Sequence, residues 1–201
     1  MGVIKALDGN AAISHGVMRS KVQLVAAYPI TPQTPIVETI SSLIDKKEYD
    51  ATYITVESEH SALSAVIGAA STGVRTFTAS ASHGLALMHE VTGVASASRL
   101  PVVMAVVSRA IPGPMCLWCD HSDIMTQRDQ GWIQLFAESP QEGLDFTMIA
   151  YRTSEDERVL TPTMVDIDGF YCSHLTEPVD VPTEDEAERF ISEFRPVNAQ
   201  L

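Results

Sequence analysis

The sequence has few cysteines and no long apolar run. Three cysteines among 201 residues are too few and too unevenly spaced for a disulfide framework, which fits a reducing compartment. No apolar stretch approaches the roughly 20 residues of a membrane span. The N-terminal residues also lack the basic start and long apolar segment of a signal peptide. We therefore expect a cytoplasmic protein without a membrane span.

Basic residues and nucleotide-binding fingerprints are also scarce. Only 13 lysines and arginines stand against 26 acidic residues, giving a net charge of −13. A nucleic-acid-binding surface needs clustered Lys and Arg to neutralise phosphates, so binding of nucleic acid is not expected. Neither GxGxxG nor the Walker motif occurs. The sequence therefore does not predict an NAD or ATP site.

Apolar segments that alternate with helical patterns are the main feature of the chain. A hydrophobic fraction of 45% supports a globular domain. The alternation predicts an α/β fold, with a largely parallel sheet and helices on both faces. The predicted strands lie near residues 24–28, 52–56, 75–79, 102–107, 132–137 and 163–167.

Three helices carry clear local signals. Residues 35–44 place apolar side chains at helical spacing after a first-turn proline. Residues 59–72 are rich in alanine, and Gly73 is suited to end that helix. A third helix, 139–154, opens with the serine, proline and returning glutamate of a capping box.

The C-terminal composition differs from the rest. Residues 176–201 contain three prolines and an acidic helical piece. This composition predicts poor packing in a core. We therefore expect a domain over residues 1–180, followed by an acidic linker or docking tail over 181–201.

Two motifs at predicted strand ends are candidates for a site. Glu57 and Glu59 lie between an apolar strand and the Ala-rich helix, where α/β proteins bind ligands. Alternatively, they are acids favoured by the positive end of the helix dipole. The proline-rich YPITPQTP segment, residues 28–35, predicts a stiff loop. The alternative is a simple turn in which Thr34 caps the next helix.

Arg109 and His83 are further candidates. Arg109 ends a strand that the sequence predicts to be buried, and arginines are seldom buried without a partner. Its planar guanidinium suits a carboxylate ligand, although a salt bridge at the edge of the domain would also explain it. His83 has the chemistry for proton transfer, but a polar loop residue is the simpler interpretation.

The segment CLWCDHSD, residues 116–123, contains two cysteines, an aspartate and a histidine within six residues. Zinc and iron–sulfur sites usually require further distant ligands, which Cys172 alone does not supply. We therefore predict no metal site. A thioredoxin-like redox pair is also disfavoured, because the cysteines lie in a proline-flanked loop rather than at a helix start.

Several motifs together resemble one family. YPITP, ESEHSA, TFTAS, SRA and DGF are similar to segments of the pyrimidine-binding domain of the 2-oxoacid:ferredoxin oxidoreductases, which are thiamine-diphosphate enzymes such as pyruvate:ferredoxin oxidoreductase. The resemblance covers about residues 8–180. It implies the thiamine-diphosphate-binding, pyrimidine-module fold. It also implies that Glu59 hydrogen-bonds the aminopyrimidine N1′ atom, and that Thr31 and Arg109 hold the substrate carboxylate.

The resemblance further implies which residues line the cofactor. One extra residue in the TFTASASHG segment departs from the family pattern and leaves open which serine or histidine faces the cofactor. DHSD aligns with a family DHQD segment, which implies packing or inter-subunit contact for Asp120, His121 and Asp123. The expected cofactor-lining residues are Tyr28, Pro29, Ile30, Glu59, Ser80, Ser82 and His83.

The partners follow from the resemblance as well. The chain lacks the GDG motif and the following Asn with which the family binds the diphosphate. Thiamine diphosphate and Mg²⁺ would therefore be shared with a pyrophosphate-binding β-type subunit. Ferredoxin-like and γ-type subunits with 4Fe–4S clusters would accept electrons, and coenzyme A would accept the acyl group. This chain alone would be inactive.

The resemblance implies oxidative decarboxylation of a pyruvate-like 2-oxoacid by a hetero-oligomer. Alternatives within the family are arylglyoxylate, branched-chain or oxalate specificity. A nonoxidative thiamine-dependent decarboxylase or synthase subunit and a noncatalytic assembly subunit also stay open.

Overall fold

The computed structural model describes residues 2–111, 113–191 and 193–197. Its centre is a six-stranded sheet in the order β3-β2-β4-β5-β7-β6, and every pairing in this sheet is parallel. The predicted α/β class is confirmed, and each predicted strand occurs with ends shifted by at most two residues. The strands are β2 (Leu24–Ala26), β3 (Thr52–Ile54), β4 (Thr76–Ser80), β5 (Val103–Ser108), β6 (Ile133–Ala137) and β7 (Thr163–Asp168).

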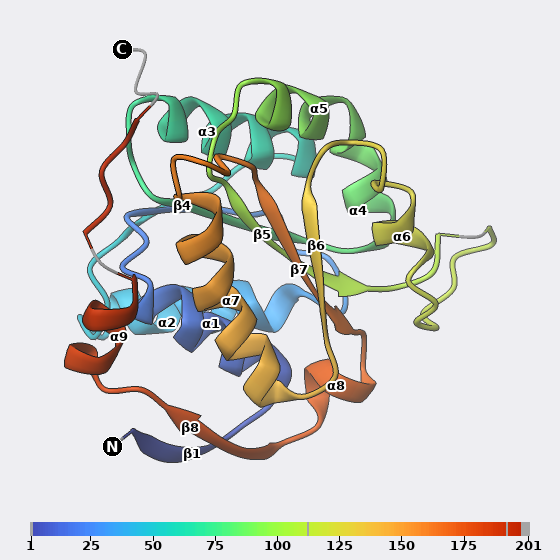
Figure 1. Cartoon of the computed structure of the whole chain (residues 1–201). Coiled ribbons are helices and arrows are strands. Elements are labelled where there is room, and N and C mark those ends of the chain that lie inside the picture. The colour runs from blue at the N-terminus through green and yellow to red at the C-terminus, as the bar shows by residue number, and fades with distance from the viewer. Residues whose placement is uncertain (1, 112, 192, 198–201) are drawn as a thin grey trace.

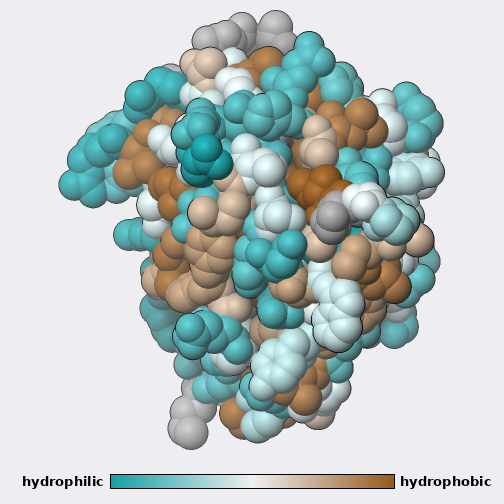
Figure 2. Space-filling view, turned by 90° about the vertical axis from the view of Figure 1, so that its right-hand side faces the viewer, coloured by the Kyte–Doolittle hydropathy of each residue, from teal (hydrophilic) through white to brown (hydrophobic). Residues whose placement is uncertain are grey.

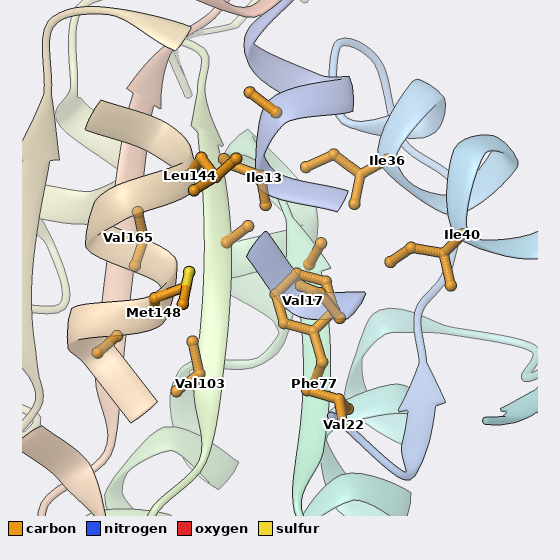
Figure 3. Close-up of a cluster of buried hydrophobic side chains, with 14 of the residues drawn as sticks. Ile13, Val17, Val22, Ile36, Ile40, Phe77, Val103, Leu144, Met148 and Val165 are labelled. Atoms are coloured by element: carbon orange, nitrogen blue, oxygen red, sulfur yellow. The ribbon is translucent and has the colours of Figure 1, made fainter. Parts of the chain in front are cut away.

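Helices cover both faces of the sheet (Figure 1). On one face lie α1 (Gly9–Arg19), α2 (Thr34–Asp45) and α7 (Pro140–Ser154), and on the other lie α3 (Glu59–Ser71), α4 (Ser82–Leu87) and α5 (His89–Ala97). Because both faces are covered, the central strands β4, β5 and β7 are buried along nearly their whole length. Figure 3 shows the core on the α1 side, formed by Ile13, Ile36, Ile40, Phe77, Val103, Leu144 and Val165 among others.

Local capping sets two of the helix starts. The Ser58 hydroxyl accepts the Ser61 N–H at 3.2 Å, so α3 begins at Glu59. Ser139 accepts the Glu142 N–H at 3.2 Å, as predicted, while the Glu142 carboxylate accepts the Glu138 N–H. In α2 the N-cap is Gln33, and no side chain caps it. The alternative that Thr34 caps this helix is therefore wrong, because Thr34 already has helical geometry.

The C-terminal segment packs onto the domain. Strand β8 (Glu177–Val181) pairs antiparallel with β1 (Val3–Leu7), and α9 (Glu184–Ile191) lies against α1 and α7 (Figure 1). Val179, Val181, Ala187 and Ile191 are buried in the core beneath these elements. This packed C-terminal segment differs from the acidic linker that the composition predicted. The strand and the helix are acidic, but their apolar residues lie on one side, and that side is buried. Residues 192 and 198–201 of the expected tail lie outside the described residues.

Two short helices complete the described elements, α6 (Ser122–Met125) and α8 (Tyr171–His174). Among the residues that the structure describes, no helix combines the length and apolar character needed to cross a bilayer.

The strand order reverses at β2, beside the carboxyl ends of β2 and β4. The chain leaves β2 towards β3 on one side and then returns to form β4 on the other side of β2. In α/β sheets, ligands bind at such a reversal, outside the carboxyl ends of the strands. The loops that follow β2 and β4, residues 27–33 and 81, leave from the carboxyl ends of these strands. They carry two of the predicted site segments.

Candidate functional site

Glu59 forms the centre of one buried polar group. It is the first residue of α3, is 8% exposed, and its carboxyl group has no hydrogen-bond partner among the described residues. Ser80, at the end of β4, also has a buried hydroxyl without a partner. A Cβ placed on Gly84 would lie 2.6 Å from both Glu59 Oε1 and Ser80 Oγ. The missing side chain of Gly84 therefore makes room for two unpartnered polar side chains.

Glu57 has a different environment. Its side chain is exposed and accepts a hydrogen bond from the Ser61 hydroxyl at 2.8 Å. This bond lowers the pKa of Glu57. Because β3 ends at Ile54 and α3 begins at Glu59, the two glutamates do not share one face of a strand. Glu57 fits the alternative of an acid near a helix N-terminus.

The Arg109 guanidinium is buried and has no ion-pair partner among the described residues. It is 5% exposed, its Nη1 donates to the Thr31 carbonyl oxygen at 2.6 Å, and its Nε is buried without a partner. No described residue forms an ion pair with it, so the alternative of a salt bridge at the domain edge is not what the structure shows. A buried unpaired cation is costly. The position therefore suits an anionic ligand.

Three of the predicted motifs lie in contact with one another around Arg109. The Gly169 N–H of the DGF segment donates to the Ser108 carbonyl oxygen at 3.1 Å. A Cβ on Gly169 would lie 2.2 Å from that oxygen and 2.9 Å from Pro32 Cγ. Asn10 donates to the Pro32 carbonyl oxygen at 3.2 Å. The structure thus brings the YPITP, SRA and DGF segments together, with Thr31 exposed beside Arg109.

The remaining predicted lining residues separate into two groups. Ser80 approaches Glu59 across the space over Gly84. The Ser82 hydroxyl instead donates to the Ala110 carbonyl oxygen at 2.8 Å and lies 3.1 Å from His83 Nδ1, and His83 is exposed. The structure therefore places Ser80 and Glu59 together at Gly84, while the Ser82 hydroxyl is bonded to Ala110. In the loop after β2, Tyr28 and Pro29 are exposed and Ile30 is half-buried.

Asp123 holds two of the site loops together. It is fully buried, and its Oδ2 accepts the Ser82 N–H at 2.7 Å and the Arg109 N–H at 2.9 Å. Its Oδ1 accepts the Ile124 N–H at 2.8 Å. The sequence predicted packing or inter-subunit contact here, and the structure shows packing within the chain. Only the fold reveals that Asp123 positions Arg109, since 14 residues separate them.

We expect Asp123→Asn to loosen these loops. The amide cannot accept all three bonds, and hydrogen bonds to a charged group contribute about 1.5–3 kcal/mol. Amide hydrogen exchange at Ser82 and Arg109 should therefore accelerate about 10- to 150-fold, as measured by mass spectrometry. The matched control is Asp129→Asn, because Asp129 is 80% exposed. Unchanged exchange in Asp123→Asn would show that the carboxylate does not hold the loops.

A family model matches residues 15–200, and its description is pyruvate flavodoxin/ferredoxin oxidoreductase, thiamine diphosphate-binding. The chain therefore belongs to this family. The parallel sheet with helices on both faces agrees with the fold that the motif resemblance implied. The buried, unpartnered Glu59 carboxyl group and the unpaired Arg109 are thus features of a member of this family.

Relatives in this family are similar along the whole chain. The chain is 48% identical over 201 residues to pyruvate synthase subunit PorA of Pyrococcus furiosus, covering 100% of this chain and 51% of the relative. It is 45% identical over 193 residues to ketoisovalerate oxidoreductase subunit VorA of Pyrococcus horikoshii, covering 96% of this chain and 48% of the relative. The chain thus spans about half the length of the curated relatives it matches.

A solved structure shares the fold. A 2-oxoglutarate:ferredoxin oxidoreductase from Magnetococcus marinus superimposes with a TM-score of 0.80 at 24% identity, covering 90% of this chain and 32% of that chain. At this identity the match supports the architecture alone.

Proposed function

We propose that this chain is the pyrimidine-binding part of an α-type subunit in a multisubunit, thiamine-diphosphate-dependent 2-oxoacid oxidoreductase. The observation that carries this proposal is that the buried Glu59 side chain and the Ser80 hydroxyl, neither with a hydrogen-bond partner among the described residues, lie together over Gly84. A carboxyl group in such a place fits a ring nitrogen of a heterocyclic cofactor. Residues 1–180, together with the end of β8 and α9 that pack onto them, would form the pyrimidine-binding domain.

When bound, thiamine diphosphate supplies the carbon nucleophile and the electron sink for loss of carbon dioxide from a 2-oxoacid. Glu59 shares a proton with a pyrimidine ring nitrogen. Ala62 and Leu63, on the next turn of α3, are buried in the core, so the start of this helix is held firmly against the sheet.

Arg109 binds and orients the substrate carboxylate. Its guanidinium is already held by the Thr31 carbonyl oxygen, so little side-chain freedom is lost when a ligand binds. The Thr31 hydroxyl can donate one further hydrogen bond to the carboxylate. The Asp123 carboxylate accepts the Arg109 N–H and so fixes the backbone position of Arg109.

The other parts of the reaction are assigned to partners. A β-type subunit would hold the diphosphate and Mg²⁺, and ferredoxin-like and γ-type subunits with 4Fe–4S clusters would receive electrons, with coenzyme A accepting the acyl group. The loop between Arg109 and α6 exposes Met115, Leu117 and Trp118. Figure 2 views the side from which this loop projects, and hydrophobic surface alternates with hydrophilic surface there. Exposed apolar side chains of this kind suit contact with a partner chain.

The substrate that we propose is pyruvate or a closely similar 2-oxoacid, in the cytoplasm. The relatives named for pyruvate and for ketoisovalerate are 48% and 45% identical to this chain, so a branched-chain 2-oxoacid is the second candidate. Arg109 and Thr31 would recognise the 2-oxoacid carboxylate that both substrates contain.

Anaerobic purification of the complex and viologen-dye reduction with a panel of 2-oxoacids test the function. We expect reduction that requires thiamine diphosphate and is fastest with one 2-oxoacid, which identifies the substrate. Release of carbon dioxide without dye reduction would favour a nonoxidative decarboxylase. Absence of both activities in an intact, cofactor-loaded complex would favour a noncatalytic assembly subunit.

Gly84→Ala is expected to slow this reaction. The new Cβ would displace the Glu59 carboxyl group, the far end of a flexible side chain 2.6 Å away, and a displacement of about 1 Å can cost about 100-fold in rate. Steady-state turnover at saturating thiamine diphosphate measures the effect.

Gly68→Ala is the matched control, because a Cβ added to this glycine of α3 would meet no atom within 4 Å. It should retain full activity and gain up to about 1 kcal/mol of helix stability. Equal turnover of the two variants would show that Gly84 does not make room for a working Glu59.

A further inference from the structure

Cys119, His121 and Asp168 form a cluster next to the Arg109 segment, in which Asp168 pairs with Ser108 across β7 and β5. One potential ligand atom from each, the Cys119 thiol sulfur, a His121 ring nitrogen and an Asp168 carboxylate oxygen, lie within 4.8 Å of one another. All three residues are half-buried, so an ion can enter from solvent. Residues 116–123 alone offer too few ligands for a metal site. The fold adds Asp168, which is distant in the sequence but close in space.

His121 is oriented as metal-binding histidines are. Its Nδ1 lies 2.7 Å from Asp166 Oδ2, and Asp166, which is 1% exposed, also accepts a hydrogen bond from the Ser108 hydroxyl. A carboxylate bonded to one ring nitrogen fixes the tautomer that leaves the other nitrogen, Nε2, as a ligand. The hydrogen bonds that support a metal-binding imidazole are therefore already present.

The backbone also holds the ligands in place. Asp168 ends β7 in register with Ser108 of β5, and the following Gly169 N–H is bonded to Ser108. The Ala110 N–H donates to the Trp118 carbonyl oxygen at 2.7 Å, which keeps the segment before Cys119 close to β5. The two ligand segments are thus anchored to the same pair of strands.

A thiol-redox role fits this cluster less well. The cluster contains a single cysteine, so it holds no dithiol pair that could form a disulfide. The described cysteines are free thiols. Sulfur, nitrogen and oxygen from three residue types are instead a ligand set for a borderline-soft metal ion.

We propose that Cys119, His121 and Asp168 bind one zinc ion. Zinc accepts thiolate, imidazole and carboxylate in a tetrahedral arrangement, whereas Mg²⁺ and Ca²⁺ prefer oxygen ligands alone. Ligand atoms of one zinc ion are about 3.3–3.6 Å apart, so the three side chains need to approach by no more than about 1.5 Å. The fourth position stays open to solvent. None of the three ligands is assigned a role in holding the cofactor or the substrate, so zinc content and dye reduction are separate readouts.

Zinc content of the purified complex tests the site. The complex is dialysed against a chelator and then against limiting zinc, and zinc per chain is measured by mass spectrometry. Cys119→Ser, His121→Gln and Asp168→Asn should each contain one zinc ion fewer than the native complex. Cys116→Ser and Cys172→Ser are the matched controls, because neither residue belongs to the cluster, and both should retain the ion.

X-ray absorption at the zinc edge of the native complex gives a second readout that needs no variant. We expect a zinc environment with one sulfur at about 2.3 Å and nitrogen or oxygen ligands at about 2.0–2.2 Å. Equal zinc content in the native complex and the three ligand variants would overturn the proposal. Loss of zinc in Cys116→Ser with retention in His121→Gln would also overturn it, because the cysteine pair would then be the site. Size-exclusion chromatography confirms that each variant complex assembles.

Discussion

Glu59→Gln is expected to lower thiamine-diphosphate-dependent dye reduction by about 10²- to 10⁴-fold, the range for loss of a general acid–base group. The amide has nearly the same shape as the carboxyl group, but it cannot give up and regain a proton. Glu59 is buried and has no hydrogen-bond partner in the described part of the chain, so the change breaks no bond within the chain. Turnover with saturating 2-oxoacid and cofactor measures the loss.

Stability should change little in this variant. Glu59 lies in the first turn of α3, where a negative charge contributes about 0.3–1 kcal/mol through the helix dipole. The complex should therefore still assemble and bind its other cofactors. A loss of activity in intact complex then reports the chemistry of the carboxyl group rather than its packing.

Glu57→Gln provides the matched control for Glu59→Gln. Glu57 lies two residues before Glu59, its side chain is exposed, and its carboxylate accepts a hydrogen bond from the Ser61 hydroxyl. This variant should keep turnover within about twofold of the native value, as surface changes away from a site usually do. If both glutamine variants lose activity equally, or if Glu59→Gln stays active, then Glu59 is not the catalytic carboxyl group.

Arg109→Met is expected to lower kcat/KM for the 2-oxoacid by about 30- to 5,000-fold, which corresponds to the roughly 2–5 kcal/mol cost of removing one partner of a buried charge pair. Methionine keeps the apolar length of the side chain while it removes the charge. The affinity for thiamine diphosphate should not change, because the proposed cofactor contacts lie at Glu59 and Ser80. Rates measured as a function of 2-oxoacid and of cofactor concentration separate the two effects.

The stability of the substrate-free protein gives Arg109→Met a second readout. The native guanidinium is buried with no ion-pair partner among the described residues, so its removal relieves a desolvation cost. The removal also loses one hydrogen bond to the Thr31 carbonyl oxygen, and the two effects oppose each other. Thermal stability without substrate should be equal to the native value or higher. A structural salt-bridge arginine would behave in the opposite way, since removing it would destabilise the fold.

Arg128→Met and Arg109→Lys complete the comparison. Arg128 is 64% exposed and pairs loosely with Asp129 at 3.7 Å, so its loss should leave kcat/KM unchanged. Lysine at position 109 keeps the charge but not the planar fork, and its kcat/KM should fall between those of the native protein and Arg109→Met. An Arg109→Met variant with native kcat/KM would rule out a carboxylate-binding role for Arg109.

The fold class and two helix starts follow from local sequence patterns. The six strands of the central sheet lie within two residues of the predicted segments, because apolar or β-branched residues dominate each segment. The starts of α3 and α7 follow from Ser58 and Ser139, because capping depends on residues three positions apart. Motif resemblance also predicted the family, which the matching family model confirms.

The tertiary structure alone decided how the candidate site is arranged. Ser80 and Glu59 lie together at Gly84, and Asp123 joins the loops of Ser82 and Arg109. These contacts connect residues that are far apart in the chain, and no local pattern specifies them.

Long-range pairing likewise placed the C-terminal segment and the metal-ligand cluster. Strand β8 packs on the domain because it pairs with β1 from the other end of the chain, a partner that composition does not reveal. Asp168 meets Cys119 and His121 because β7 lies beside β5 in the sheet. Sequence patterns report the local preference of each segment, whereas the neighbours of each segment are set by the packing of the whole chain.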